Sequence, residues 1–208
     1  MLLPYKALTA HTLHPHTSFH QYQQGLPKRV TPESSALDVM TDLKRVKAVT
    51  ITADASINTA LQKMIHAEVR LLLVINAYNT VLGVITARDL LGEKPVNYVA
   101  RARVPREDIR VEHIMTPTER LQVLHIDEVT HARVGDIILT LKEAGRQHGL
   151  VLERHPSNDG DIIRGIFSTT QIGKQLGVDI QPTGRVQSFA ELEQVLVGSQ
   201  HLSGIARP

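Results

Sequence analysis

The sequence predicts an α+β fold in which one strand–helix–strand–strand–helix unit occurs twice. Similar motifs open the two units, Val-Met-Thr at residues 39–41 and Ile-Met-Thr at residues 114–116. Similar motifs also close them: residues 83–89 read Gly-Val-Ile-Thr-Ala-Arg-Asp, and residues 165–171 read Gly-Ile-Phe-Ser-Thr-Thr-Gln. Because copies of a small unit stack on one another, the duplication predicts a shared interface with a cleft that can hold a ligand.

Each unit is expected to begin with a short β-strand followed by an amphipathic helix. The β-rich runs are residues 49–52 and 123–126. Either Asp54 or Ser56 is suited to cap the first helix, since both side chains accept hydrogen bonds from free helix N–H groups. Apolar residues at helical spacing predict the buried faces, which are Ile57, Leu61, Met64 and Ile65 in the first unit and Val134, Ile137, Ile138 and Leu141 in the second.

Two apolar strands and a second helix complete each unit. In the first unit the strands are predicted at residues 71–75 and 81–86, with a helix from about residue 88 that stops by Gly92 and Pro95. Unbroken apolar runs of this length are typical of strands covered on both faces. In the second unit, residues 153–160 carry Pro, Ser, Asn, Asp and Gly between two apolar runs, which predicts a longer hairpin turn.

Composition excludes several classes of function. The 208 residues suffice for two small lobes, and the absence of cysteine removes disulfides, thiolate zinc sites and cysteine nucleophiles. With only 3% aromatic residues and a net charge of +2, we do not expect a nucleic-acid partner, and residues 44–47 (Lys-Arg-Val-Lys) are interpreted as a solvated loop. No membrane span or secretion signal is recognised, so a cytoplasmic location is expected.

The chain divides into five predicted segments. Residues 1–34 form an extended arm with four histidines, for which no metal site is predicted because helical spacing and partner carboxylates are missing. The first repeat is residues 35–95, a linker is residues 96–108, and the second repeat is residues 109–177. Residues 178–208 are expected to hold a C-terminal helix at 188–197, which begins with the capping-box residues Ser188 and Glu191.

Thr86 and Asp89 in the first closing motif admit two interpretations. At a strand-to-helix turn, the Thr86 hydroxyl and free backbone N–H groups suit a phosphate, while the Asp89 carboxylate suits a pair of sugar hydroxyls, and together these describe a nucleotide. Alternatively, Thr86 only caps the helix and Asp89 completes the capping box. Spacing alone leaves both open.

Residues from about 36 to 176 resemble a tandem pair of CBS domains, often called a Bateman module. The resemblance rests on residues 38–41, 60–64, 72–75 and 83–91, taken in this order and duplicated. It implies two βαββα CBS repeats packed through their sheets in a pseudo-twofold module, with the N-terminal arm and C-terminal helix outside it. It also implies homodimers and clefts that bind AMP, ATP or, in some members, S-adenosylmethionine.

Carried over to this chain, the resemblance implies one good ligand cleft per chain. It places Thr86 on phosphate and Asp89 on ribose, and the remaining expected cleft residues are Thr52, Val69, Arg70, Leu71, Arg88 and Thr116. Arg70 has an alternative interpretation as a surface side chain with a packed stem. A second, weaker cleft is expected around Thr41, Ser168, Thr170 and Gln171, since the Gln171 amide lacks the charge that strengthens contacts to ribose.

The sequence therefore predicts a regulatory module without catalysis of its own. Neither a catalytic pair nor a phosphate-binding glycine-rich loop with lysine is recognisable, so no enzyme is predicted and no cofactor is required. An adenine nucleotide, AMP or ATP, is the expected ligand, and an unknown effector protein is the expected receiver of the signal. The alternatives are a ligand-independent dimerisation scaffold, an S-adenosylmethionine-binding module and, through residues 44–47, a nucleic-acid-binding module.

Overall fold

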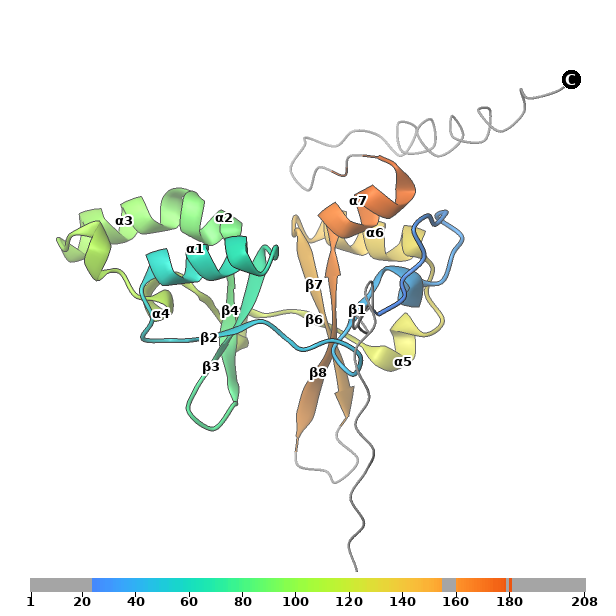
Figure 1. Cartoon of the computed structure of the whole chain (residues 1–208), viewed down its shortest axis with the longest axis horizontal. Helices are drawn as coiled ribbons and strands as arrows, with labels where there is room; N and C mark the ends of the chain where they lie inside the picture. The colour runs from blue at the N-terminus through green and yellow to red at the C-terminus, as the bar shows by residue number, and fades with distance from the viewer. Residues whose placement is uncertain (1–23, 155–159, 179, 181–208) are drawn as a thin grey trace, which may run out of the picture.

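The computed structural model describes residues 24–154, 160–178 and 180, and it confirms the predicted α+β architecture of two repeats packed through their sheets (Figure 1). The predicted helix at 188–197 and most of the N-terminal arm lie outside the described residues. The first repeat contains β2 (Thr50–Thr52), α1 (Ile57–His66), β3 (Leu71–Ile75), β4 (Val81–Thr86) and α2 (Ala87–Leu91). The second contains β6 (Val123–His125), α5 (Ile126–Val129), α6 (Val134–Glu143), β7 (His148–Arg154), β8 (Asp161–Ser168) and α7 (Thr169–Leu176).

The remaining elements lie before β2 or between α2 and β6. The 3-10 helix η1 (Ala36–Val39) and the strand β1 (Thr41–Asp42) come before β2 and open the first repeat. Between α2 and β6 lie α3 (Glu93–Ala102), η2 (Arg106–Asp108), α4 (Val111–Ile114), β5 (Thr116–Pro117) and η3 (Thr118–Arg120). None of the helices in the described ranges combines the length and apolar character that a membrane span requires.

Each four-stranded sheet contains one short strand that comes from the segment opening the other repeat. The strand orders are β2-β3-β4-β5 and β1-β8-β7-β6. Strand β1 pairs antiparallel with β8, with Thr41 opposite Ile166, and β5 pairs antiparallel with β4, with Thr116 opposite Val84. This reciprocal exchange ties the repeats together by backbone hydrogen bonds and places each opening motif beside the other repeat's closing motif.

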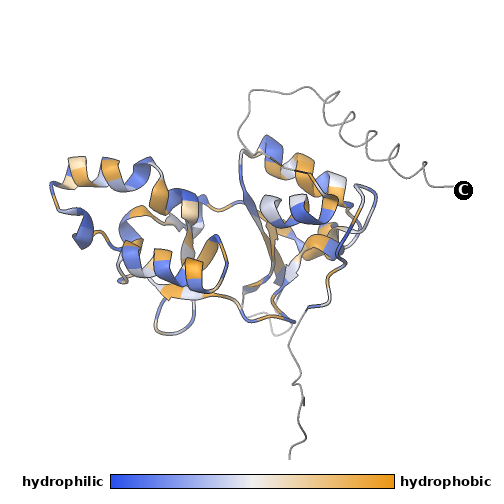
Figure 2. Ribbon diagram, turned by 45° about the horizontal axis from the view of Figure 1, so that its top comes forward, coloured by the Kyte–Doolittle hydropathy of each residue, from blue (hydrophilic) through white to orange (hydrophobic). Residues whose placement is uncertain are grey.

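Among the described residues, three apolar clusters form the cores. The repeat cores lie between each sheet and its helices, and a third cluster lies between the two sheets, with Leu71, Leu73, Val84 and Leu150 buried. Burial of each such side chain contributes about 2 kcal/mol, an upper estimate because unfolded chains already bury some surface. Figures 1 and 2 show the two sheets facing each other with helices outside, and apolar and polar positions alternating along those helices.

The predicted signals of α1 and α6 are met with one exception. Ser56 rather than Asp54 caps α1, since its hydroxyl accepts a hydrogen bond from the Thr59 N–H at 3.0 Å. All four predicted core residues of α6 are buried. Ile65, predicted on the buried face of α1, is wrong, because 62% of it is exposed. It follows the buried Met64 directly, so the helix turns it about 100° away from the core stripe.

Helix α3 occupies much of the segment expected to be a linker. Pro95 was interpreted as a helix stop, but it lies buried in the first turn of α3, where its missing N–H costs nothing. Tyr98 and Val99 pack against the core of the first repeat, and the Tyr98 ring stacks on the His113 ring with centroids 4.6 Å apart.

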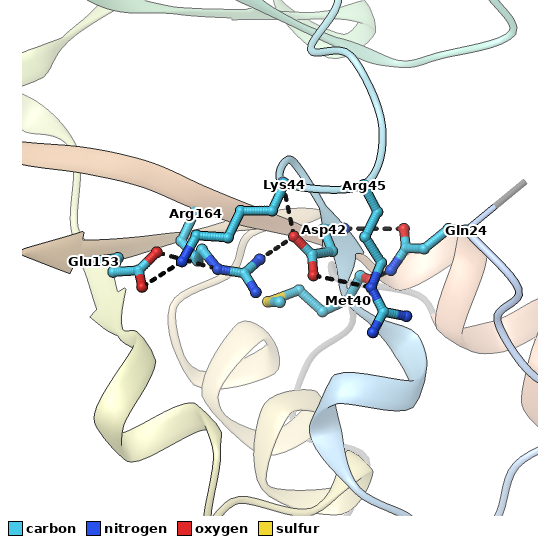
Figure 3. A network of polar contacts seen from close by, with 7 residues as sticks. All are labelled: Gln24, Met40, Asp42, Lys44, Arg45, Glu153 and Arg164. Carbon is cyan, nitrogen blue, oxygen red and sulfur yellow. Dashed lines mark hydrogen bonds and ion pairs between the residues drawn. The ribbon is translucent and has the colours of Figure 1, made fainter. Parts of the chain in front are cut away.

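A cluster of charged side chains fixes β1 to the second repeat (Figure 3). The Asp42 carboxylate pairs with the Arg164 guanidinium on β8 and accepts a hydrogen bond from the Lys44 N–H at 2.8 Å. Arg164 Nε also lies 3.2 Å from Glu153 Oε2, and Glu153 Oε1 lies 2.6 Å from Lys44 Nζ. The Asp42 and Arg164 side chains are only 10% and 15% exposed, so this pair is largely shielded from water.

Gly83 is the point at which the exchanged strand β5 approaches β4 most closely. A Cβ at this position would clash with the Thr116 carbonyl oxygen and lie 2.9 Å from Pro117 Cα. Since both neighbours are backbone, Gly83→Ala is expected to lower the free energy of unfolding by about 2 to 3 kcal/mol. Chemical denaturation of the purified protein measures the change.

Gly135→Ala is the matched control for this prediction. A Cβ at Gly135, in α6, would meet only ordinary contacts, with Pro32 O at 3.5 Å, so the higher helix propensity of alanine should raise stability by about 0.5 to 1 kcal/mol. Equal stabilities for the two variants would show that β5 is not packed against Gly83.

Candidate functional site

A cavity of about 250 Å³ lies between the repeats where β3, β4 and β7 meet the helical end of the module. This volume is just below the roughly 300–1,000 Å³ typical of small-molecule sites, so a nucleotide would fill it and extend outward. We call this cavity the first cleft. Both repeats line it, through Leu71, Val84, Thr86, Arg88, Asp89, Thr116, Leu121, Gln122, Gly145, Arg146, Gln147, His148 and Leu150.

Five of the residues expected in the ligand cleft line this cavity. Leu71 begins β3, Thr86 ends β4, and Arg88 and Asp89 lie in the first turn of α2. Thr116 belongs to the opening motif of the second repeat, and it reaches the cavity because β5 pairs with β4.

Three expected residues do not line the first cleft. The Thr52 side chain hydrogen-bonds the Asp54 carboxylate, which is the main reason that the pKa of Asp54 lies below its usual value. Val69 packs against the core of the first repeat. Arg70 reaches toward the second repeat, where its Nη1 donates to Thr170 Oγ1 at 3.2 Å.

The second repeat supplies one wall of the first cleft, and the residues of this wall were not predicted from the sequence. Arg146, Gln147 and His148 lie before and at the start of β7, as Val69 and Arg70 lie before β3. The residues before each first long strand therefore face the other repeat's closing motif. The internal alignment of the two copies pairs residues 146–147 with residues 69–70, so the sequence contains a clue to this wall. The clue can be used only when it is known that each repeat faces the closing motif of the other.

Thr86 and Asp89 form a complete capping box at the start of α2. Asp89 Oδ2 accepts hydrogen bonds from the Thr86 N–H at 2.8 Å and the Thr86 hydroxyl at 2.7 Å, and the Asp89 N–H lies 3.2 Å from Thr86 Oγ1. Asp89 Oδ1 lies 2.7 Å from Lys94 Nζ in the first turn of α3. The interpretation of Thr86 and Asp89 as capping residues is therefore confirmed. A ligand on Asp89 has to bind while these capping hydrogen bonds are present.

The carboxylate retains limited capacity for a further ligand. Two carboxylate oxygens offer about four acceptor positions, and Thr86 and Lys94 occupy three of them. One sugar hydroxyl can therefore bind Asp89 Oδ1 directly, whereas a second requires Lys94 or the Thr86 hydroxyl to move. The Asp89 side chain is 12% exposed, so it is accessible only from within the cleft.

His148 adds a neutral polar group to the same cleft. Burial, reinforced by the positive charge of Arg70 and opposed by Asp89, lowers the pKa of His148 to about 4. At neutral pH the imidazole is uncharged, and it offers one hydrogen-bond donor and one acceptor. The charges around the cleft are therefore those of Arg88, Arg146 and Lys94 against the single carboxylate of Asp89.

Two of the four residues expected in the second cleft, Thr170 and Gln171, are already bonded to neighbouring side chains. Besides the contact of Thr170 with Arg70, Gln171 Nε2 donates to Gln175 Oε1 at 3.2 Å. Thr41 and Ser168 lie on β1 and β8, the exchanged strand and its partner. Within the described residues, no group of three or more potential metal ligands converges.

A larger groove of about 740 Å³ opens between the sheets at the hairpin end. Leucine, isoleucine and valine side chains form most of its wall, its charged residues are Lys47 and Asp161, and none of the predicted site residues lies in it. We regard the smaller first cleft as the functional candidate, because it combines apolar walls with a converging carboxylate and cations.

Comparisons with known proteins agree with this architecture. The CBS domain family model matches residues 36–95. The chain is similar in fold to an uncharacterized conserved protein from Pyrococcus horikoshii, with 23% identity, a TM-score of 0.51, and coverage of 76% of this chain and 99% of that one. No match was found among curated proteins.

Two further solved structures have TM-scores just under 0.5. A CBS-domain containing protein from Agrobacterium tumefaciens is 24% identical, covers 75% of this chain and 98% of its own, and has a TM-score of 0.49. CBSX2 from Arabidopsis thaliana, solved in complex with AMP, is 22% identical, covers 67% of this chain and 93% of its own, and has a TM-score of 0.47.

Proposed function

We propose that the chain, whose residues 36–95 match the CBS domain family and whose fold contains two such repeats, binds one adenine nucleotide, AMP or ATP, in the first cleft and acts as a regulatory module. The observation that carries the proposal is the position of Asp89. Its carboxylate faces a cavity that is lined by two arginines, Arg88 and Arg146, and walled by both repeats, and it pairs with Lys94.

The cleft offers a separate surface for each part of a nucleotide. Apolar side chains of Leu71, Val84, Leu121 and Leu150 suit the faces of a base. Asp89 suits the sugar hydroxyls, since hydrogen bonds to a charged acceptor are stronger than those between neutral groups. Arg88 and Arg146 suit the phosphates, because a guanidinium matches phosphate oxygens in charge and geometry.

The charge of the cleft favours a nucleotide over S-adenosylmethionine. The cationic sulfonium group would lie among two arginines and Lys94, where like charges repel, whereas a phosphate gains from the same field. The second cleft, around Thr41, Ser168, Thr170 and Gln171, is proposed to bind more weakly or to stay empty, since Thr170 and Gln171 already pair with other side chains and Gln171 carries no charge for ribose.

Binding would change the relation between the repeats because both contribute walls. A ligand shifts a conformational equilibrium only by its different affinity for the two states, so a ligand touching both repeats favours the arrangement in which both walls contact it. We propose that a partner protein senses this arrangement and that the chain itself performs no catalysis. A homodimer is also proposed, in which the exposed Ile65 and Leu91 on α1 and α2 are covered.

Calorimetric titration of the full chain with AMP, ATP and S-adenosylmethionine tests the function. We expect saturable binding of AMP or ATP with one site per chain, and weaker binding of S-adenosylmethionine. Saturable binding of none of the three would favour the ligand-independent scaffold, and a preference for S-adenosylmethionine would contradict the charge argument.

A further inference from the structure

Lys94 connects the first cleft with the segment that joins the repeats. Its Nζ lies 2.7 Å from Asp89 Oδ1, 3.0 Å from the Ile114 carbonyl oxygen and 3.4 Å from Thr116 Oγ1. It therefore joins the first turn of α2, the first turn of α3, the end of α4 and the start of β5. Because the Lys94 side chain is 45% exposed, it can move without disrupting a core.

We propose that Lys94 makes the first cleft selective for adenosine ligands that carry a phosphate. The inference rests on the proposed nucleotide site and adds its basis for discrimination. Lys94 occupies an acceptor position on Asp89 Oδ1, the oxygen that Thr86 leaves free for a sugar. Engagement of both sugar hydroxyls through Oδ1 therefore separates the ammonium from its carboxylate.

The separated ammonium has a cost that depends on the ligand. Lys94 lies in the first turn of α3, where the partial positive charge of the helix N-terminus disfavours a cation that has lost its counter-ion. A neutral nucleoside offers no replacement, so it either leaves Lys94 on Asp89 and loses a hydroxyl contact, or it leaves the ammonium without a counter-ion, with only the neutral acceptors of Ile114 and Thr116. A nucleotide supplies an anion in the same cleft and compensates for the separation.

Lys94 should therefore weaken the binding of adenosine and strengthen the binding of AMP. Without the ammonium, Asp89 is free to accept both sugar hydroxyls from any adenosine ligand, while a phosphate loses one of its cations. A charge-assisted hydrogen bond corresponds to roughly 10- to 150-fold in affinity, which is large enough to measure as a ratio.

The experiment compares AMP and adenosine binding by calorimetry in wild type, Lys94→Met, Lys94→Arg and the control Lys63→Met, which removes an exposed lysine of α1. We expect wild type and Lys63→Met to prefer AMP by about 100-fold, and Lys94→Met to reduce the preference to about tenfold or less. The reduction should come from tighter adenosine binding as well as weaker AMP binding. Lys94→Arg should keep most of the preference, and melting curves should show that all variants fold.

The outcomes separate this inference from the proposed function. Nucleotide binding with an AMP-to-adenosine ratio that Lys94→Met leaves unchanged would overturn the role of Lys94 and leave the nucleotide site standing. Equal affinity of the wild type for AMP and adenosine would also overturn the role of Lys94 and leave the ligand site standing. If wild type binds neither ligand, the proposed function and this inference both fall.

Discussion

Asp89→Asn is expected to weaken the binding of AMP by about 30-fold, because neutral hydrogen bonds replace charge-assisted ones to the sugar. Asparagine keeps the size of the side chain and an oxygen that accepts from the Thr86 N–H, so the turn between β4 and α2 is expected to survive. The measurement is a calorimetric titration of AMP into wild type and variant under the same buffer and salt.

Asp136→Asn is the matched control for Asp89→Asn. Asp136 has the same position in α6 that Asp89 has in α2, since its Oδ2 accepts a hydrogen bond from the Arg133 N–H at 2.8 Å. It does not line the first cleft. Both changes lose a charge near a helix N-terminus, worth about 0.3 to 1 kcal/mol of stability, but only Asp89→Asn should affect AMP. Unchanged AMP affinity in Asp89→Asn would leave Asp89 with the capping role alone.

The repeated architecture was predictable from the sequence because local patterns determine it. The apolar spacing in α6 predicted four residues that are all buried, and the strand runs at 71–75 and 81–86 match β3 and β4. Such patterns state which face of an element meets a core. They do not show where a new helix begins after a break. Because Pro95 was interpreted as a helix stop, α3 was not predicted.

The exchange of strands between repeats was not predictable from such patterns. Strands β1 and β5 have two residues each, which is too short for an alternation to be read, and their partners lie far away in the sequence. The composition of the first cleft depends on this exchange. The spacing of the closing motif predicted Thr86 and Asp89 as cleft residues, because both lie on one turn. Arg146 and His148 could be predicted only from knowledge of how the two repeats face each other.

Asp42→Ala is expected to lower the free energy of unfolding by about 3 kcal/mol, because it leaves a largely buried guanidinium without its main partner. Figure 3 shows that Asp42 faces Arg164 across the junction of β1 and β8, with Glu153 on the other side of the guanidinium. Because Glu153 still attracts the Arg164 guanidinium, the expected loss lies at the lower end of the roughly 3 to 5 kcal/mol that breaking a buried ion pair costs. Urea denaturation at neutral pH measures the change.

Glu33→Ala provides the control, because it breaks a pair of the same chemistry at an exposed position. Glu33 pairs with Arg133, and their side chains are 71% and 64% exposed, so the expected change is no more than about 0.5 kcal/mol. A loss for Asp42→Ala as small as that for Glu33→Ala would mean that water screens the Asp42–Arg164 pair. A loss of about 3 kcal/mol would show that this pair holds β1 on the sheet of the second repeat.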